Sequence, residues 1–168
     1  MPKRLLERWR PECIREFRAT ARLRYDDGLS LAGQGRRTGA IYMWGYCAEM
    51  SLKAAYFSVT LSDTTPITWG GHLQPAIQRG RTFMMIAWPH QGAGHNVRAW
   101  AELLVAERAA TPGRAYAPAV GQQVQACGQR IGQLWNESLR YHNNLAYQHE
   151  VTQVRLAAEW LVVNLGSL

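Results

Sequence analysis

The residues of this chain that could do chemistry lie together near its end, in the sequence RYHNNLAYQH at positions 140–149. A histidine near its ordinary pKa can act as an acid or a base at neutral pH, and an arginine fork matches the geometry of phosphate. A side-chain amide can orient that phosphate. The stretch is therefore the candidate site for chemistry in this chain. Its members are Arg140, Tyr141, His142, Asn143, Asn144, Tyr147 and His149.

Two hypotheses follow for this stretch. In the catalytic one, Arg140 and His149 are the main pair, because the histidine can move a proton and the arginine can stabilise the charge on a phosphate. In the structural one, Arg140 caps the C-terminus of the preceding helix, where a cation is favourable, and the two tyrosines and His149 pack the corner between helices. The residues around the pair in the catalytic hypothesis are His142, Asn143, Asn144 and Tyr147.

Two helices must position these side chains, one on each side of the stretch. Apolar residues recur at helical spacing from Val120 to Leu134, which predicts a fourth helix over residues 117–139. The same periodicity from Val151 to Leu165 predicts the last helix.

Three main helices are predicted before this pair. The first covers residues 12–32, with Pro11 at its start, and the second covers residues 38–58. The break between them, GQGRR, is not a phosphate-binding loop, because no GK[ST] follows it. Asn96 is a predicted N-cap for a third main helix that ends near Ala109.

The fold class expected from these patterns is all-α. Residues 62–93 interrupt the main helices as an insertion, with a short extra helix that starts at Pro75. No stretch alternates between apolar and polar residues over the length of a strand. We therefore expect an up-and-down bundle of about five helices in a single domain over residues 1–168, with a basic arm at residues 1–10.

Positive charge is concentrated at the beginning of the chain, whose formal net charge is +7. The outer face of the first predicted helix carries Arg15, Arg18 and Arg22. Such a face is usually an ordinary solvated surface, and the alternative is a footprint for RNA or another partner.

Other features of the sequence limit the class of protein. Cys13, Cys47 and Cys127 are far apart and lack CxxC spacing, which predicts free thiols and a cytoplasmic location. No apolar run is long enough for a membrane helix, so we expect no membrane association. The remaining histidines have no metal-binding spacing, and no motif indicates a metal or a cofactor. Trp69 and Trp88, in or beside loops, are candidates for base stacking.

Three segments resemble the HEPN family of helical bundles. The segment AIYMWGYCAEMSLKAAYF, at residues 40–57, has the small residues and the Glu-x-x-x-Lys pattern of the family's second helix, here Glu49 and Lys53. LWNESLRYHNN and the closing apolar helix are similar to the family's Trp…Arg-Tyr stretch and last helix. GHNVRAWAELL is similar to its middle helix. The resemblance covers most of the chain except residues 62–93.

The resemblance implies two activities. Many HEPN proteins are metal-independent ribonucleases, whose signature is an arginine, a polar residue, three to five further residues and a histidine. Arg140 matches the arginine, but Tyr141 follows it, His142 comes too early and His149 comes too late. This departure favours a member that has lost catalysis. Cleavage by Arg140 and His149 at an unusual spacing is the alternative.

The family also implies a homodimer and a nucleotidyltransferase-type partner protein, in a toxin–antitoxin or defence setting. We therefore expect a non-catalytic module that binds a partner protein, a nucleotide or RNA. The alternatives are a ribonuclease and a structural dimer without ligand. The expected binding residues are Asn143, Asn144, Tyr147, Glu49, Lys53, Arg15, Arg18 and Arg22.

Overall fold

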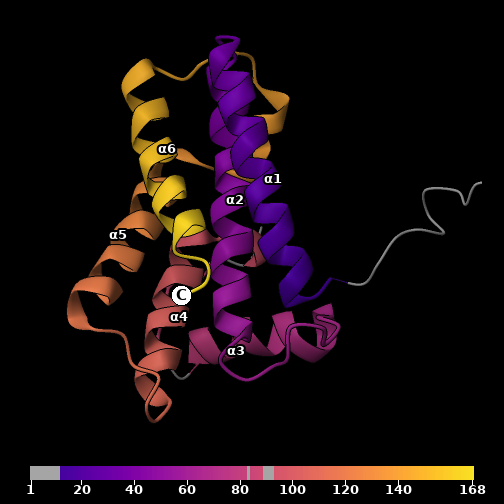
Figure 1. Cartoon of the computed structure of the whole chain (residues 1–168), viewed down its shortest axis with the longest axis vertical. Coiled ribbons are helices and arrows are strands. Elements are labelled where there is room, and N and C mark those ends of the chain that lie inside the picture. Colours follow the sequence, from indigo (N-terminus) through magenta and orange to yellow (C-terminus); the bar gives the residue numbers. More distant parts are fainter. Residues whose placement is uncertain (1–11, 83, 89–92) are drawn as a thin grey trace, which may run out of the picture.

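The computed structural model describes residues 12–82, 84–88 and 93–168, so the predicted basic arm at 1–10 lies outside the described residues. Within these ranges the chain forms helices and no strand, which confirms the all-α bundle. The main helices are α1 (Ile14–Gly33), α2 (Arg37–Phe57), α3 (Gln74–Thr82), α4 (Val97–Ala110), α5 (Pro118–Leu134) and α6 (Gln148–Val163). Figure 1 shows α1, α2 and α6 along the long axis, with α3 across one end.

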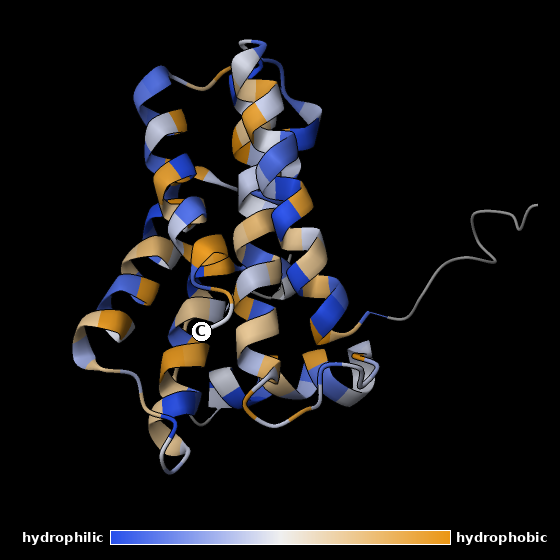
Figure 2. Cartoon of the chain, viewed as in Figure 1, coloured by the Kyte–Doolittle hydropathy of each residue, from blue (hydrophilic) through white to orange (hydrophobic). Residues whose placement is uncertain are grey.

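Helix α2 is the centre of the bundle, because it contacts α1, α4, α5 and α6. Its sequence is apolar or small on almost every side, as expected for a helix buried all round. The outer helices show hydrophilic residues interspersed with apolar ones, as expected where one face is buried (Figure 2). Trp44 of α2 is fully buried, and its indole N–H donates to the Tyr25 carbonyl of α1 at 3.1 Å.

The predicted insertion at 62–93 packs against the bundle where it is described. The Ile67 N–H donates to the Glu12 carbonyl at 2.7 Å, which holds the loop to the start of α1. The predicted short helix is present as α3, with Pro75 in its first turn. A π-helical turn at Trp69–Leu73 precedes it in the sequence. Trp88 is buried edge-to-face on Trp100, with 5.1 Å between the ring centroids.

The end predicted for the fourth helix is wrong. Helix α5 stops at Leu134, and Trp135 takes an extended conformation where residues 135–139 were expected to be helical. The Trp135 indole N–H donates to the Tyr42 carbonyl at 3.1 Å, and its ring lies so close to Gly45 that a Cβ there would overlap it. Docking of this ring on α2 therefore ends the helix. A 3-10 helix, Glu137–Tyr141, follows.

Candidate functional site

A cleft of about 470 Å³ opens where α1 ends and α2 begins, and the 3-10 helix with the loop after it forms its other wall. Its described lining includes two guanidinium groups, an imidazole, two side-chain amides and a phenol, and no carboxylate. We call it the cation cleft. The lining residues are Leu31, Arg36, Thr38, Gly39, Tyr42, Met43, Leu139, Arg140, His142, Asn143 and Asn144.

The loop at residues 142–147 is fixed to the start of α2 by Thr38 and Asn144. The Asn144 amide oxygen accepts from the Thr38 N–H at 3.1 Å, and its NH₂ donates to the Gly35 carbonyl at 2.8 Å. The Thr38 hydroxyl accepts from the N–H groups of Leu145 at 2.7 Å and Ala146 at 3.0 Å. Asn144 therefore holds the wall of the cation cleft in place, while the side chain of Asn143 has no such bond among the described residues.

Arg140 lies in the 3-10 helix and lines the cation cleft, so the prediction that it caps α5 is wrong. Its guanidinium carbon is 4.7 Å from the centre of the Tyr141 ring, in cation–π contact. The charge interaction with Tyr141 raises the pKa of Arg140, and hydrogen bonding to Tyr42 raises it as well. Arg140 therefore stays cationic. The structural hypothesis required Tyr141 to pack the corner between helices. Tyr141 is instead 75% exposed, so this part of the hypothesis is wrong.

A second hollow of about 200 Å³ adjoins the cation cleft, because Thr38 and Leu139 line both. It is mostly apolar, and we call it the apolar hollow. Its lining residues are Thr38, Ile41, Leu134, Leu139, Leu145, Ala146, Tyr147 and Glu150. The Glu150 carboxylate accepts from the Tyr147 N–H at 2.7 Å and so caps the N-terminus of α6.

His149 does not line the cation cleft with Arg140. Its imidazole is parallel to the Tyr147 ring, with 5.8 Å between the centroids and 10° between the planes. Tyr147 is 66% exposed, so the expected packing of this tyrosine into the corner is also wrong. The structure therefore brings Arg140, His142, Asn143 and Asn144 to one cavity, and His149, the predicted partner of Arg140, is not in its lining.

Glu49 and Lys53 form the predicted ion pair, but inside the core. Lys53 Nζ is 2.6 Å from Glu49 Oε1, and the side chains are 7% and 0% exposed. The other carboxylate oxygen is 2.9 Å from Nδ1 of His95, whose ring is 40% exposed. This hydrogen bond raises the pKa of His95. Sequence reasoning missed His95 as a partner because it lies 46 residues from Glu49 and no spacing rule joins them.

Aromatic rings connect this buried pair to the cation cleft. The Tyr46 ring lies edge-on to His95 at 6.0 Å between centroids, to Trp135 at 5.3 Å and to Tyr42 at 5.0 Å. Burial, and then a hydrogen bond with Tyr42, raise the pKa of Tyr46. Glu49, Lys53 and His95 therefore support the wall behind the cleft, and Tyr42 is the member of this group that reaches its lining.

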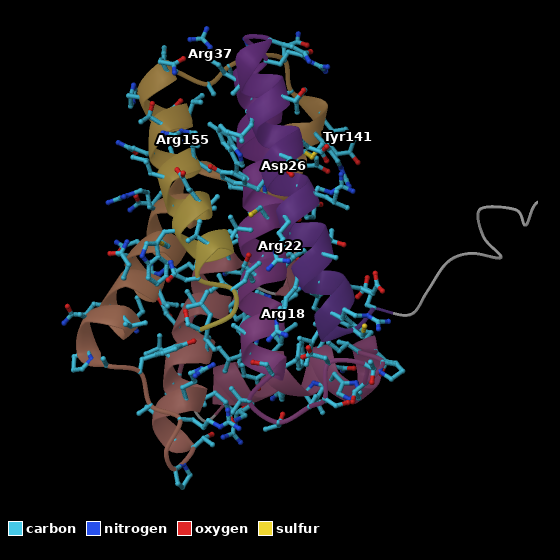
Figure 3. The ribbon with its side chains drawn as sticks, viewed as in Figure 1. Arg18, Arg22, Asp26, Arg37, Tyr141 and Arg155 are labelled. Atoms are coloured by element: carbon cyan, nitrogen blue, oxygen red, sulfur yellow. The ribbon has the colours of Figure 1, made fainter. Side chains whose placement is uncertain are left out.

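The basic face expected on α1 is partly neutralised. The Arg18 guanidinium donates to both carboxylate oxygens of Asp63, at 2.9 and 3.0 Å. The Arg15 guanidinium lies 3.8 Å from the Glu16 carboxylate. Arg22 is exposed, and Figure 3 shows Arg18, Arg22 and Asp26 following one another along the helix. The three arginines therefore lie among carboxylates and do not form a purely cationic surface.

Several other predictions can be placed. Trp88 is buried and Trp69 is 55% exposed, so only the latter offers a ring to solvent. All three cysteines are free and buried. Among the described residues, no group of three or more histidine, cysteine or acidic side chains is arranged to hold a metal ion. No helix in the same part of the chain is long and apolar enough to cross a membrane.

Comparison of the chain with models of protein families, with curated proteins and with solved structures finds no match. The function is therefore argued from the geometry of the site.

Proposed function

We propose that this protein is a non-catalytic module that binds the phosphate of a nucleotide or of RNA in the cation cleft. The observation that carries the proposal is the charge of the lining. Arg36 and Arg140 contribute two permanent cations, and no carboxylate lines the cavity to balance them. An anionic ligand supplies the missing counter-charge, and arginine with side-chain amides is the donor set that suits phosphate.

The position and size of the cation cleft support the same ligand. Thr38 and Gly39, in the first turn of α2, belong to its lining, so the positive end of the helix dipole adds to the two guanidinium groups. Its volume of about 470 Å³ lies in the usual range for small-molecule sites. Arg37, labelled in Figure 3 at the end of the bundle, is a further cation at the start of α2 but lies outside the lining of the cleft.

The arrangement of the histidines favours binding over catalysis. His149 is stacked on Tyr147 outside the cation cleft. His142 lines the cleft, but none of the described residues hydrogen bonds its ring to fix the tautomer that a general base needs. Metal-independent RNA cleavage by Arg140 and His149 is the alternative that the experiments below test.

The resemblance adds three parts to this proposal: a homodimer, a nucleotidyltransferase-type partner protein and a toxin–antitoxin or defence setting in the cytoplasm. Light scattering of the purified protein tests the first, since a monomeric mass at micromolar concentration would remove it. Co-purification with a co-expressed nucleotidyltransferase tests the second.

Calorimetric titration with AMP and fluorescence anisotropy with a short single-stranded RNA test the phosphate site. Arg140→Ala should weaken both ligands at least about tenfold, because it removes a charge-assisted contact. Arg130→Ala is the matched control, because Arg130 is exposed on α5 and outside the cation cleft. Equal weakening by both variants would indicate a general effect of charge and would refute the site.

Incubation of total RNA with the protein in EDTA separates binding from cleavage. We expect the RNA to stay intact. Cleavage by the wild type that disappears in both Arg140→Ala and His149→Ala would refute the non-catalytic proposal and establish the ribonuclease alternative.

A further inference from the structure

We infer that the apolar hollow is a base subsite, so that the ligand is a nucleotide unit whose base stacks on Tyr147 while its phosphate lies at Arg140. This inference rests on the proposed phosphate site and adds the chemical class of the rest of the ligand. It selects a nucleotide, free or in a single strand, over a sugar phosphate or inorganic phosphate.

The two cavities are adjacent and chemically opposite. They share Thr38 and Leu139 in their linings, so a ligand that lies across these two residues would reach both. The cation cleft offers guanidinium and amide groups, and the apolar hollow offers Ile41, Leu134 and Leu145. A molecule with a charged end and a flat, weakly polar end is complementary to both, and a nucleotide has this division between phosphate and base.

Tyr147 has the geometry of a stacking platform. Tyr147 belongs to the lining of the apolar hollow and is mostly exposed, and the imidazole of His149, in the first turn of α6, lies parallel to its ring. Exposed aromatic rings bind bases in this way because every base has a flat π face. The base must be unpaired to reach such a ring, so the geometry favours a single strand over a duplex.

Glu150 adds a hydrogen-bond acceptor for the base. One of its carboxylate oxygens accepts from the Tyr147 N–H at 2.7 Å, and Glu150 belongs to the lining of the apolar hollow. A carboxylate accepts hydrogen bonds and cannot donate them. The subsite therefore offers an acceptor to a hydrogen-bond donor on the base, such as the exocyclic amino group of adenine.

The test is a calorimetric series with AMP, ribose 5-phosphate and inorganic phosphate. The wild type should bind AMP about tenfold more tightly than ribose 5-phosphate, because only AMP can stack. Equal affinities for these two would overturn the base subsite and leave the phosphate site standing. Absence of binding by every phosphate compound would instead refute the phosphate site itself.

Variants assign the effect to the ring. Tyr147→Ala should weaken AMP about tenfold and leave ribose 5-phosphate unchanged, whereas Tyr147→Phe keeps the affinity for AMP. Leu156→Ala is the matched control, because Leu156 is an exposed apolar residue of α6 outside both cavities. Equal weakening of both ligands by Tyr147→Ala would overturn the inference.

Discussion

Lys53→Met is expected to destabilise the protein strongly, because it leaves the Glu49 carboxylate in the core with one partner in place of two. The Glu49 side chain has no exposed surface, and the Lys53 ammonium lies 2.6 Å from one of its oxygens. The ammonium also lies 5.5 Å from the centre of the Trp100 ring. Methionine keeps the length and packing of the lysine stem, so the change removes the charge and little else.

The expected magnitude follows from burial. Removing one member of a buried ion pair costs about 3–5 kcal/mol, whereas the same change in an exposed pair costs about 0.2–1 kcal/mol. A domain of this size loses about 2–4 °C in melting temperature for each kcal/mol. We therefore expect Lys53→Met to lower the melting temperature by about 10 °C, and double replacement with Glu49→Gln to lower it less.

The loss should also depend on pH through His95. The hydrogen bond to Glu49 raises the pKa of His95, so the folded protein holds this proton more tightly than the unfolded chain. The resulting stability is complete below the unfolded pKa of about 6.5 and is lost as the pH rises through the folded value. Without Lys53, protonated His95 is the remaining cation beside Glu49 among the described residues. Lys53→Met should therefore be less stable at about pH 8.5 than at about pH 6.

Urea unfolding followed by tryptophan fluorescence, at these two pH values, measures both effects. Arg24→Met is the matched control, because the Arg24–Asp27 ion pair has a similar distance of 2.6 Å but is exposed. A loss below about 1 kcal/mol for Lys53→Met would refute the reasoning from burial. A pH dependence that persists in Lys53→Met/His95→Asn would refute the assignment to His95.

Three further changes test other parts of the structure. Thr38→Val should lower the free energy of unfolding in urea by about 1–3 kcal/mol, because two backbone N–H groups lose their acceptor; an unchanged value would show that the loop is held otherwise. Gly45→Ala should lower the melting temperature because its Cβ overlaps the Trp135 ring, whereas Gly33→Ala, with nothing within 4 Å, should not. Burial raises the pKa of the Cys47 thiol to about 12, so a thiol reagent at about pH 8 should modify Cys47 only after unfolding. Fast reaction of Cys47 in the native protein would contradict this burial.

Local pattern was sufficient to predict the helices and the fold class. Periodicity placed the buried faces of all the main helices because a helix repeats its contacts every three or four residues. Asn96 was predicted as an N-cap, and its side chain accepts from the Ala99 N–H at 3.0 Å. The apolar pattern before the reactive stretch ends at Leu134, as α5 does. The prediction failed only where the helix was extended past that residue to residue 139.

The end of α5 was beyond local reasoning because a distant residue decides it. Trp135 leaves the helix to dock against Gly45, and its indole hydrogen bond reaches the Tyr42 carbonyl, 93 positions earlier in the chain. The pattern within residues 117–139 cannot predict that the Trp135 ring packs against Gly45.

The sequence by itself determined which residue types could bind phosphate and that most of them lie in one stretch, because residue identity and local order are properties of the chain. Only the tertiary structure decided which of them share a cavity. It placed Arg140 and His142 with Arg36 in one lining and put His149 on Tyr147 outside it. It also turned Glu49 and Lys53 into a buried pair that His95 joins. The physical reason is that burial and charge pairing depend on neighbours that only the packing of helices brings together.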